Sequence, residues 1–204
     1  MKSSFVYKSI NENSESLFKD KGSKHFGFAY PVQSLDEIHN KVDFLRKEHG
    51  KANHVCYAYR LRSKGNLEEF STDDGEPKNS AGPPILGQIN SKELQNVLVA
   101  VVRYFGGTKL GVSGLINAYK TAAKMAIESS VIINKEDEIK YQLWFTYAVY
   151  NDVMRFVKEN EINIVREENN ESCFLEIGLK ESSHQLLIGQ LNKIEITSCT
   201  KLVL

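Results

Sequence analysis

The sequence predicts an α+β protein with two domains. Eleven of the 13 glycines and all four prolines precede residue 115 of the 204-residue chain. Residues 1–135 carry 19 basic and 14 acidic side chains, whereas residues 136–204 carry 7 and 12. Such a change in turn residues and in charge is typical of a domain boundary. We therefore expect one domain at residues 1–134 and a second at residues 135–204.

The first half of the chain predicts a mixed α/β domain. Alternating and β-branched stretches indicate strands, and apolar residues three or four apart indicate helices. Ser34 and Glu37 form a predicted capping box for a helix that Gly50 ends. Its inward face is predicted to contain Leu35, Ile38, Val42 and Leu45. In order, we expect strands at 4–10 and 25–32, that helix, a hairpin of 54–61 and 67–71 turning near Gly65, a buried strand at 96–105 and an Ala-rich helix at 114–128.

The second half predicts the element order β-α-β-β-α-β, which is the order of a ferredoxin-like sandwich. The expected strands lie at 140–149, 162–166, 172–179 and 195–204, with a helix at 151–159 and another that Ser182 and Gln185 cap. Alternation places Trp144 and Phe174 on the face opposite the helices. We favour contact between this aromatic face and the first domain or a protein partner; the alternative is stacking of RNA bases. The face toward the helices is predicted to contain Tyr141, Leu143, Phe145 and Tyr147.

Composition narrows the class of protein. The 26 basic and 26 acidic residues give a formal net charge of zero, which argues against a uniformly basic surface for nucleic acid or membranes. The longest aliphatic run, residues 97–102, is too short to span a bilayer. The N-terminus lacks the apolar stretch of a secretory signal, and three widely spaced cysteines do not make a disulfide framework. We expect a cytoplasmic protein with free thiols and no membrane partner.

An acidic loop at residues 71–84, STDDGEPKNSAGPP, is the first segment that suggests function. Asp73, Asp74 and Glu76 lie among glycines and prolines, residue types that shape a turn. Three carboxylates at this spacing suit a hard cation such as Mg²⁺. The alternative, which we favour, is a turn in which an Asp accepts backbone N–H bonds, because the acids lack the ligand pattern of a known cation loop.

A glycine-rich loop at residues 103–115, RYFGGTKLGVSGL, is the second such segment. Backbone N–H groups in a glycine turn, a helix N-terminus and Lys109 are together suited to hold an anion. The glycine spacing matches neither a Walker A motif nor a dinucleotide fingerprint. Two interpretations of these glycines are equally open: they bind an anion or a partner, or they permit close packing of the backbone.

His54 and Cys56 share one face of a predicted strand. An activated thiol needs the imidazole within hydrogen-bond reach and a third orienting group, and no such group is identifiable. A buried, inert cysteine is the simpler interpretation.

Four segments resemble the IMPACT (YigZ) family. They are KGSKHFGFA at 21–29, HVCYAYRL at 54–61, STDDGEPKNSAGPPIL at 71–86 and NVLVAVVRYFGGTKLGVSGLINAY at 96–119. The chain is similar to a bacterial two-domain member, and it departs from the family pattern at Asn79-Ser80 and Ser113. Asn tolerates left-handed backbone and Ser is a good N-cap, so both changes are expected to keep the backbone shape.

The resemblance implies a fold and a broad role. The first domain is expected to be similar to the second domain of ribosomal protein S5, and the second to a C-terminal domain of translation elongation factor G. In eukaryotic relatives the shared domain binds a large activator of a starvation-responsive initiation-factor kinase and so restrains that kinase. The resemblance supplies no catalytic set, and we expect neither a metal nor a cofactor. Its signature loops correspond here to Asp73, Asp74, Gly75, Glu76, Pro77, Arg103, Tyr104, Phe105, Gly106, Gly107, Lys109, Leu110 and Gly111.

Two functions from different classes follow. The leading hypothesis is a non-enzymatic binding protein of translation or its regulation, which engages RNA, the ribosome or a translation-associated protein through a basic first domain. The alternative is an enzyme that acts on a phosphate-bearing small molecule in a cleft between the two loops. The candidate partner-binding residues are Lys19, Lys21, Lys24, Asp73, Asp74, Glu76, Arg103, Tyr104, Gly106, Gly107, Lys109 and Gly111.

Overall fold

A computed structural model describes residues 6–63 and 66–202, and these residues form two compact units. The first unit is Tyr7–Lys135, and the second begins at Glu136 and also includes Val6. The expected hairpin turn near Gly65, and the ends of the expected strands at 4–5 and 203–204, lie outside the described residues.

The first unit is built on a five-stranded antiparallel sheet with the strand order β2-β3-β6-β4-β5. Two further strands, β1 and β7, pair with each other in a separate two-stranded sheet. The elements in chain order are β1 Val6–Ile10, β2 Ser14–Asp20, β3 Ser23–Pro31, α1 Leu35–Glu48, β4 His54–Ser63, β5 Asn66–Thr72, α2 Gly82–Ser91, β6 Val97–Tyr104, α3 Gly111–Glu128 and β7 Ile132–Glu136.

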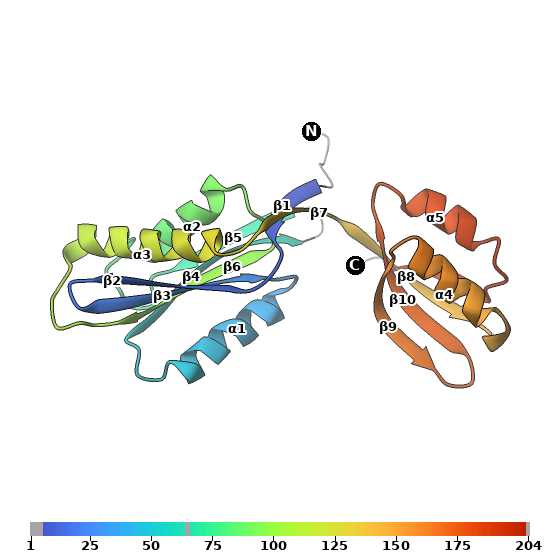
Figure 1. The fold of residues 1–204 in the computed structure, drawn as a ribbon, viewed down its shortest axis with the longest axis horizontal. Coiled ribbons are helices and arrows are strands. Elements are labelled where there is room, and N and C mark those ends of the chain that lie inside the picture. The colour runs from blue at the N-terminus through green and yellow to red at the C-terminus, as the bar shows by residue number, and fades with distance from the viewer. Residues whose placement is uncertain (1–5, 64–65, 203–204) are drawn as a thin grey trace. The chain divides into compact units, whose positions relative to one another are not determined.

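Helices cover both faces of the large sheet (Figure 1): α2 and α3 lie on one face and α1 lies on the other. The central strand β6 is buried along seven of its eight residues because both of its faces are covered. Its odd-numbered residues from Val97 to Val101 pack under α2 and α3, whereas Leu98, Ala100 and Val102 pack under α1. The alternation of side chains along β6 therefore separates two cores.

The sequence predictions for the first unit hold for most elements and fail at several points, among them the absence of any prediction for β7. Ser34 caps α1 through a bond from the Glu37 N–H, but Leu35 is 38% exposed and does not belong to the core. Strand β2 was not expected; only its first residue, Ser14, is buried. Helix α2 was also missed, and it begins inside the stretch that the sequence assigned to a loop.

The second unit has the order strand, helix, strand, strand, helix, strand. All neighbouring strands are antiparallel, and their order in the sheet is β11-β8-β10-β9. Helices α4 and α5 pack on one face, over a core that contains Leu143, Leu175 and Val153. The elements are β8 Glu138–Phe145, a 3₁₀ turn at Tyr147–Val149, α4 Tyr150–Glu159, β9 Asn163–Asn169, β10 Cys173–Lys180, α5 His184–Leu191 and β11 Ser198–Lys201.

Two local predictions in the second unit are wrong. Tyr147 does not face the helices, because β8 ends at Phe145 and Tyr147 lies in the 3₁₀ turn with 54% of its surface exposed. Ser182 and Gln185 do not cap α5: Ser183 precedes the helix without a side-chain bond, and the Ser182 N–H donates to Glu136. The predicted aromatic pair does form, with Trp144 and Phe174 ring centroids 4.7 Å apart.

No helix among the described residues is both long enough and apolar enough to cross a membrane.

Candidate functional site

The carboxylate of Asp73 is used inside its own loop. Its Oδ1 accepts the N–H groups of Ala81 and Gly82 at 2.9 and 2.8 Å, and its Oδ2 accepts that of Asn79 at 2.7 Å. The free N–H groups at the start of α2 are thereby satisfied by a residue upstream of the helix. Burial works to raise the pKa of Asp73, but the three backbone bonds outweigh it and hold the pKa below its ordinary value. The interpretation as a turn with an N–H-accepting Asp is thus the one that the geometry supports.

Asp74 attaches the acidic loop to β4 and α1. Its Oδ2 accepts the Val55 N–H at 2.7 Å, and its Oδ1 pairs with Arg46 at 2.9 Å. The main-chain carbonyl of Asp74 lies 2.7 Å from Nδ1 of His54. Asp74 and Asn79 both have positive φ angles, 44° and 64°. Asn79 therefore has the left-handed backbone that its sequence predicted.

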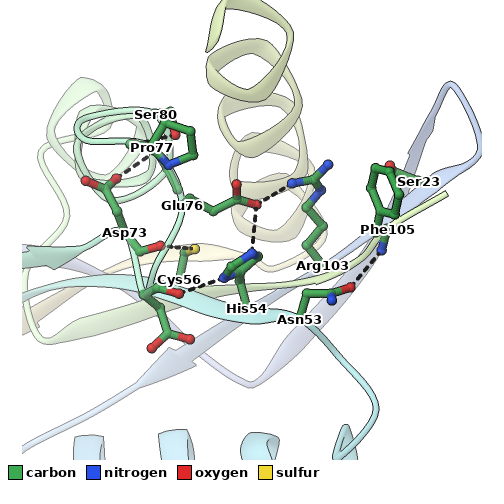
Figure 2. Close-up of polar contacts among 12 residues, drawn as sticks. Ser23, Asn53, His54, Cys56, Asp73, Glu76, Pro77, Ser80, Arg103 and Phe105 are labelled. Atoms are coloured by element: carbon green, nitrogen blue, oxygen red, sulfur yellow. Dashed lines mark hydrogen bonds and ion pairs between the residues drawn. The ribbon is translucent and has the colours of Figure 1, made fainter. Parts of the chain in front are cut away.

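Glu76 is the centre of a buried polar cluster on the face under α2 and α3 (Figure 2). Its side chain is 3% exposed, and its Oε1 accepts a bond from Arg103 Nη1 at 2.6 Å. The same oxygen accepts a bond from the Tyr119 hydroxyl at 2.7 Å. His54 Nε2 lies 3.8 Å from the same oxygen. The Arg103 side chain is only 8% exposed. Arg103 and Glu76 are therefore partners of each other, and they hold the acidic loop against β6.

His25 extends this cluster across the sheet. Phe18, His25, Arg103 and His54 are register partners on four adjacent strands, so their side chains form a row on one face. His25 is fully buried, its ring packs edge-on against Tyr119 with centroids 5.4 Å apart, and neither ring nitrogen has a hydrogen-bond partner among the described residues. Burial, and then the charge of Arg103, lower the pKa of His25 from 6.5 to about 4.

The low pKa of His25 predicts an acid-sensitive fold. In the unfolded chain the imidazole takes up a proton near pH 6.5, but in the folded protein it does so only near pH 4. Protons therefore favour the unfolded state as the pH falls from 6.5 to 4, and stability is lost in that window. Between pH 7 and pH 4.5, the free energy of unfolding of the wild type should fall by on the order of 2 kcal/mol more than that of His25→Gln, as measured by urea unfolding. Parallel losses in the two proteins would contradict a neutral buried His25.

Cys56 does not have the surroundings of a reactive thiol. It is fully buried, its Sγ donates to the Asp73 carbonyl at 2.9 Å, and burial raises the pKa of the thiol. Reactive cysteines require accessible thiolate, and desolvation opposes it. No group of three or more His, Cys, Asp or Glu side chains within residues 6–63 and 66–202 is placed to hold a metal ion.

The glycine loop is joined to the β2–β3 turn by direct backbone contact. A Cβ on Gly106 would lie 1.9 Å from the carbonyl carbon of Gly22, so only glycine fits there. The Gly106 N–H donates to Ser23 Oγ at 3.1 Å. Close backbone packing thus explains why residue 106 is a glycine. The backbone that it packs against belongs to the β2–β3 turn and not to the helix that follows the loop. Gly107 and Gly111 have positive φ angles of 86° and 72° with open space around them.

Helix α3 begins earlier than the sequence indicated. Its first residue is Gly111, and Leu110 precedes it without a side-chain cap. Ser113 therefore lies within the first turn and is not the N-cap that we expected. Lys109 is exposed just before this helix.

A pocket of about 370 Å³ opens on the other side of the sheet, beside the same two turns. Its aromatic wall is ordered, because the Tyr104 hydroxyl lies 2.9 Å from His49 Nδ1 and the Phe26 ring packs against both. Phe105 is 48% exposed, and its N–H donates to Asn53 Oδ1 at 3.1 Å. The pocket is lined by Gly22, Lys24, Phe26, His49, Tyr104 and Phe105.

The segment that supplies both the buried cluster and the pocket also identifies the family. Residues 21–127, more than half of the chain, match the family described as the Impact N-terminal domain. The chain belongs to the IMPACT family. Its sequence is 30% identical to IMPACT family member YvyE of Bacillus subtilis over 65% of this chain and 59% of that protein, so it spans less than two thirds of that relative. An IMPACT family member of Haemophilus influenzae is 24% identical over 85% of this chain and 84% of its own length.

One solved structure has a similar fold over nearly the whole chain. A crystal structure described as that of a hypothetical protein superposes with a TM-score of 0.70 at 21% identity and covers 98% of both chains. A structure of the two-domain translational regulator Yih1 covers 60% of this chain and 47% of its own at 26% identity, with a TM-score of 0.36.

The predicted site residues of this IMPACT-family chain fall into two groups on opposite faces of the sheet. Asp73, Glu76 and Arg103 belong to the internal contacts of the α2/α3 face. Lys24 and Tyr104 line the pocket on the α1 face, and Lys21 and Gly106 belong to the turns beside it. Sequence reasoning missed His25 and Tyr119 in the cluster and Phe26 and His49 in the pocket. Two of these, His25 and Phe26, are adjacent in the segment KGSKHFGFA, and alternation along a strand places them on opposite faces, but the sequence does not show which partners each face holds.

Proposed function

We propose that this chain is a non-enzymatic binding protein of translation or its regulation, and that RNA binds at the edge of the first unit formed by the β2–β3 turn and the loop after β6. The observation that carries the proposal is a group of exposed lysines without an ion pair among the described residues: Lys19, Lys21, Lys24 and Lys109. Unpaired lysines on one edge are suited to phosphate.

The arrangement of these lysines supports a shared binding edge. Lys19 and Lys24 are register partners on β2 and β3, so their side chains leave the same face of the sheet. Lys21 lies in the turn between them, and the contact of Gly22 with Gly106 holds that turn beside the glycine loop. The fixed turn holds these positive charges at one edge of the sheet, where they form no ion pairs with other described residues.

The acidic loop supports binding over catalysis. Each of its three carboxylates already accepts hydrogen bonds within the fold: Asp73 from three backbone N–H groups, Asp74 from Val55 and Arg46, and Glu76 from Arg103 and Tyr119. A general base or a cation ligand needs free lone pairs directed at a ligand. These carboxylates instead rigidify the loop that lies under β6.

The link to translation is proposed from membership in the IMPACT family, whose eukaryotic members we expect to act there. We also propose that the two units are the predicted domains, 1–134 and 135–204. The antiparallel order β11-β8-β10-β9 with two helices on one face supports a ferredoxin-like second domain. Similarity of the domains to ribosomal protein S5 and elongation factor G remains a prediction, as does a cytoplasmic location.

Reversing charge at the turn should weaken RNA binding. We expect Lys21→Glu with Lys24→Glu to reduce affinity for ribosomal RNA at least tenfold at low salt, because two phosphate contacts are lost. The slope of log K against log salt concentration should become shallower by about one to two. Fluorescence anisotropy over a salt series and co-sedimentation with purified ribosomes measure both effects.

A double variant on α3, Lys120→Glu with Lys124→Glu, reverses the same number of charges on exposed residues elsewhere in the first unit. It should retain most of the affinity. Absence of association with RNA or ribosomes at low salt, or equal losses in the two double variants, would contradict RNA binding at this edge. If the chain instead binds a protein partner, and that binding persists at high salt and after ribonuclease treatment, the ligand is a protein and not RNA.

A further inference from the structure

We infer that the pocket beside Tyr104 and Phe105 receives a base of single-stranded RNA, while Lys24 and Lys19 hold the adjacent phosphates. This inference rests on the proposed function and adds to it the site and the chemical class of the bound group. It follows from the volume and lining of the pocket, the contacts of its aromatic side chains and the charge at its rim.

The pocket combines a polar entrance with an aromatic interior. Lys24 is the register partner of Tyr104, so its side chain leaves the sheet on the pocket face, next to the tyrosine. Lys19 follows on β2 in the same row. The pocket has a volume of about 370 Å³, which lies in the range of pockets that hold small organic groups. A planar ring with an attached anion fits such a lining better than an aliphatic side chain does.

The aromatic rings of the pocket are held in place before any ligand binds. Tyr104 is fixed by its contact with His49, and their ring centroids lie 5.9 Å apart in an edge-on arrangement. The Phe105 main chain is positioned by the bond of its N–H to Asn53, and the Arg103 guanidinium lies 5.7 Å from the centroid of its ring. An exposed phenylalanine held in this way is suited to stack a base, because its side chain loses little conformational entropy when the base binds.

The charge at the rim distinguishes RNA from an apolar peptide. Lys19 and Lys24 are exposed and have no ion pair among the described residues, so their charges are available to an anion. Asp20 does not neutralise this face: it is the register partner of the buried Ser23, on the opposite side of the sheet. Stacking groups beside phosphate-binding lysines are the usual means of holding single strands without reading their sequence.

Two probes of equal charge separate base stacking from phosphate attraction. One is a labelled 12-nucleotide oligouridine RNA and the other is a 12-mer of the same backbone with abasic riboses. The wild type should bind oligouridine about tenfold or more tightly than the abasic strand at moderate salt. Phe105→Ala should weaken oligouridine binding by about 5- to 100-fold, toward the abasic value, and leave the salt slope unchanged.

Phe44→Ala is the matched control, because Phe44 is also exposed, at 54%, and does not line the pocket. Thermal unfolding of both variants shows whether the fold is kept. A second measurement adds a signal: Phe105→Trp in a Trp144→Phe background leaves one indole in the chain, at the pocket. Oligouridine should quench its fluorescence, and the abasic strand should not.

The outcomes distinguish this inference from the proposed function. Equal affinity of the wild type for the two probes, or unchanged oligouridine binding by Phe105→Ala, would overturn the pocket as a base site and leave electrostatic RNA binding intact. Failure of both probes to bind at low salt would overturn the two proposals together.

Discussion

Replacing Glu76 with alanine is expected to lower the free energy of unfolding by about 3–5 kcal/mol. The substitution leaves Arg103 with 8% of its side chain exposed and without the carboxylate 2.6 Å away. It also removes the acceptor of the buried Tyr119 hydroxyl. An unpaired buried charge costs more than the pair itself contributes, because the guanidinium cannot recover its hydration.

Urea unfolding followed by circular dichroism measures this loss. The control is Glu128→Ala, which breaks only exposed ion pairs with Lys92 and Lys124 and should cost less than about 1 kcal/mol. Adding Arg103→Met to Glu76→Ala should recover part of the stability, since the charge is then gone as well. A cost for Glu76→Ala as small as that of the control would show that Arg103 finds water or another partner.

Replacing Asp73 with alanine is expected to destabilise the first unit by about 2–4 kcal/mol. Three backbone N–H groups at 79, 81 and 82 lose an ionised acceptor, and two of them lie at the start of α2. Helix α2 has no other side-chain cap. Asp73→Asn should cost less than Asp73→Ala, because its amide oxygen still accepts some of these bonds.

Amide hydrogen exchange locates the effect of Asp73. The amides of residues 79, 81 and 82 should lose protection in Asp73→Ala at denaturant concentrations where the sheet is still protected. Asp36→Ala, in the first turn of α1, removes an exposed acid that does not cap its helix and serves as the control. Unchanged protection at those three amides would show that the backbone of the loop does not depend on the carboxylate.

Much of the fold could be predicted from the sequence because the signals were local. The buried run of β6 and the alternation of β10 require only neighbouring residues to be recognised. Helix α2 was missed because its first turn contains Pro83 and Pro84, which usually mark a turn, although proline is also tolerated there. Its capping group is Asp73, which lies eight and nine residues before the two amides at the helix start that it binds, much farther than the two or three residues of an ordinary N-cap.

The candidate site was predictable as a set of segments but not as an arrangement. Arg103 and Tyr104 are adjacent in a recognisable motif, yet one is buried against Glu76 and the other lines a pocket on the opposite face. Alternation along a strand requires that they separate, but which face holds which partner depends on α1 and α3. His49 reaches the pocket from the end of α1, 55 residues before Tyr104, so only the tertiary fold reveals the contact.

The bonds of Asp73 also limit the length of the chain around it. The bond from the Gly82 N–H to the Asp73 carboxylate closes a loop of residues 73–82. At Gly82 the loop also packs tightly, because a Cβ there would lie 2.7 Å from the backbone of Thr72. An extra residue between 73 and 79 would shift the amides of 79, 81 and 82 together relative to the carboxylate. Most surface loops accommodate insertions, but we expect an insertion here to destabilise the loop. We therefore expect the length of the acidic loop to be more constrained than the identity of its exposed side chains.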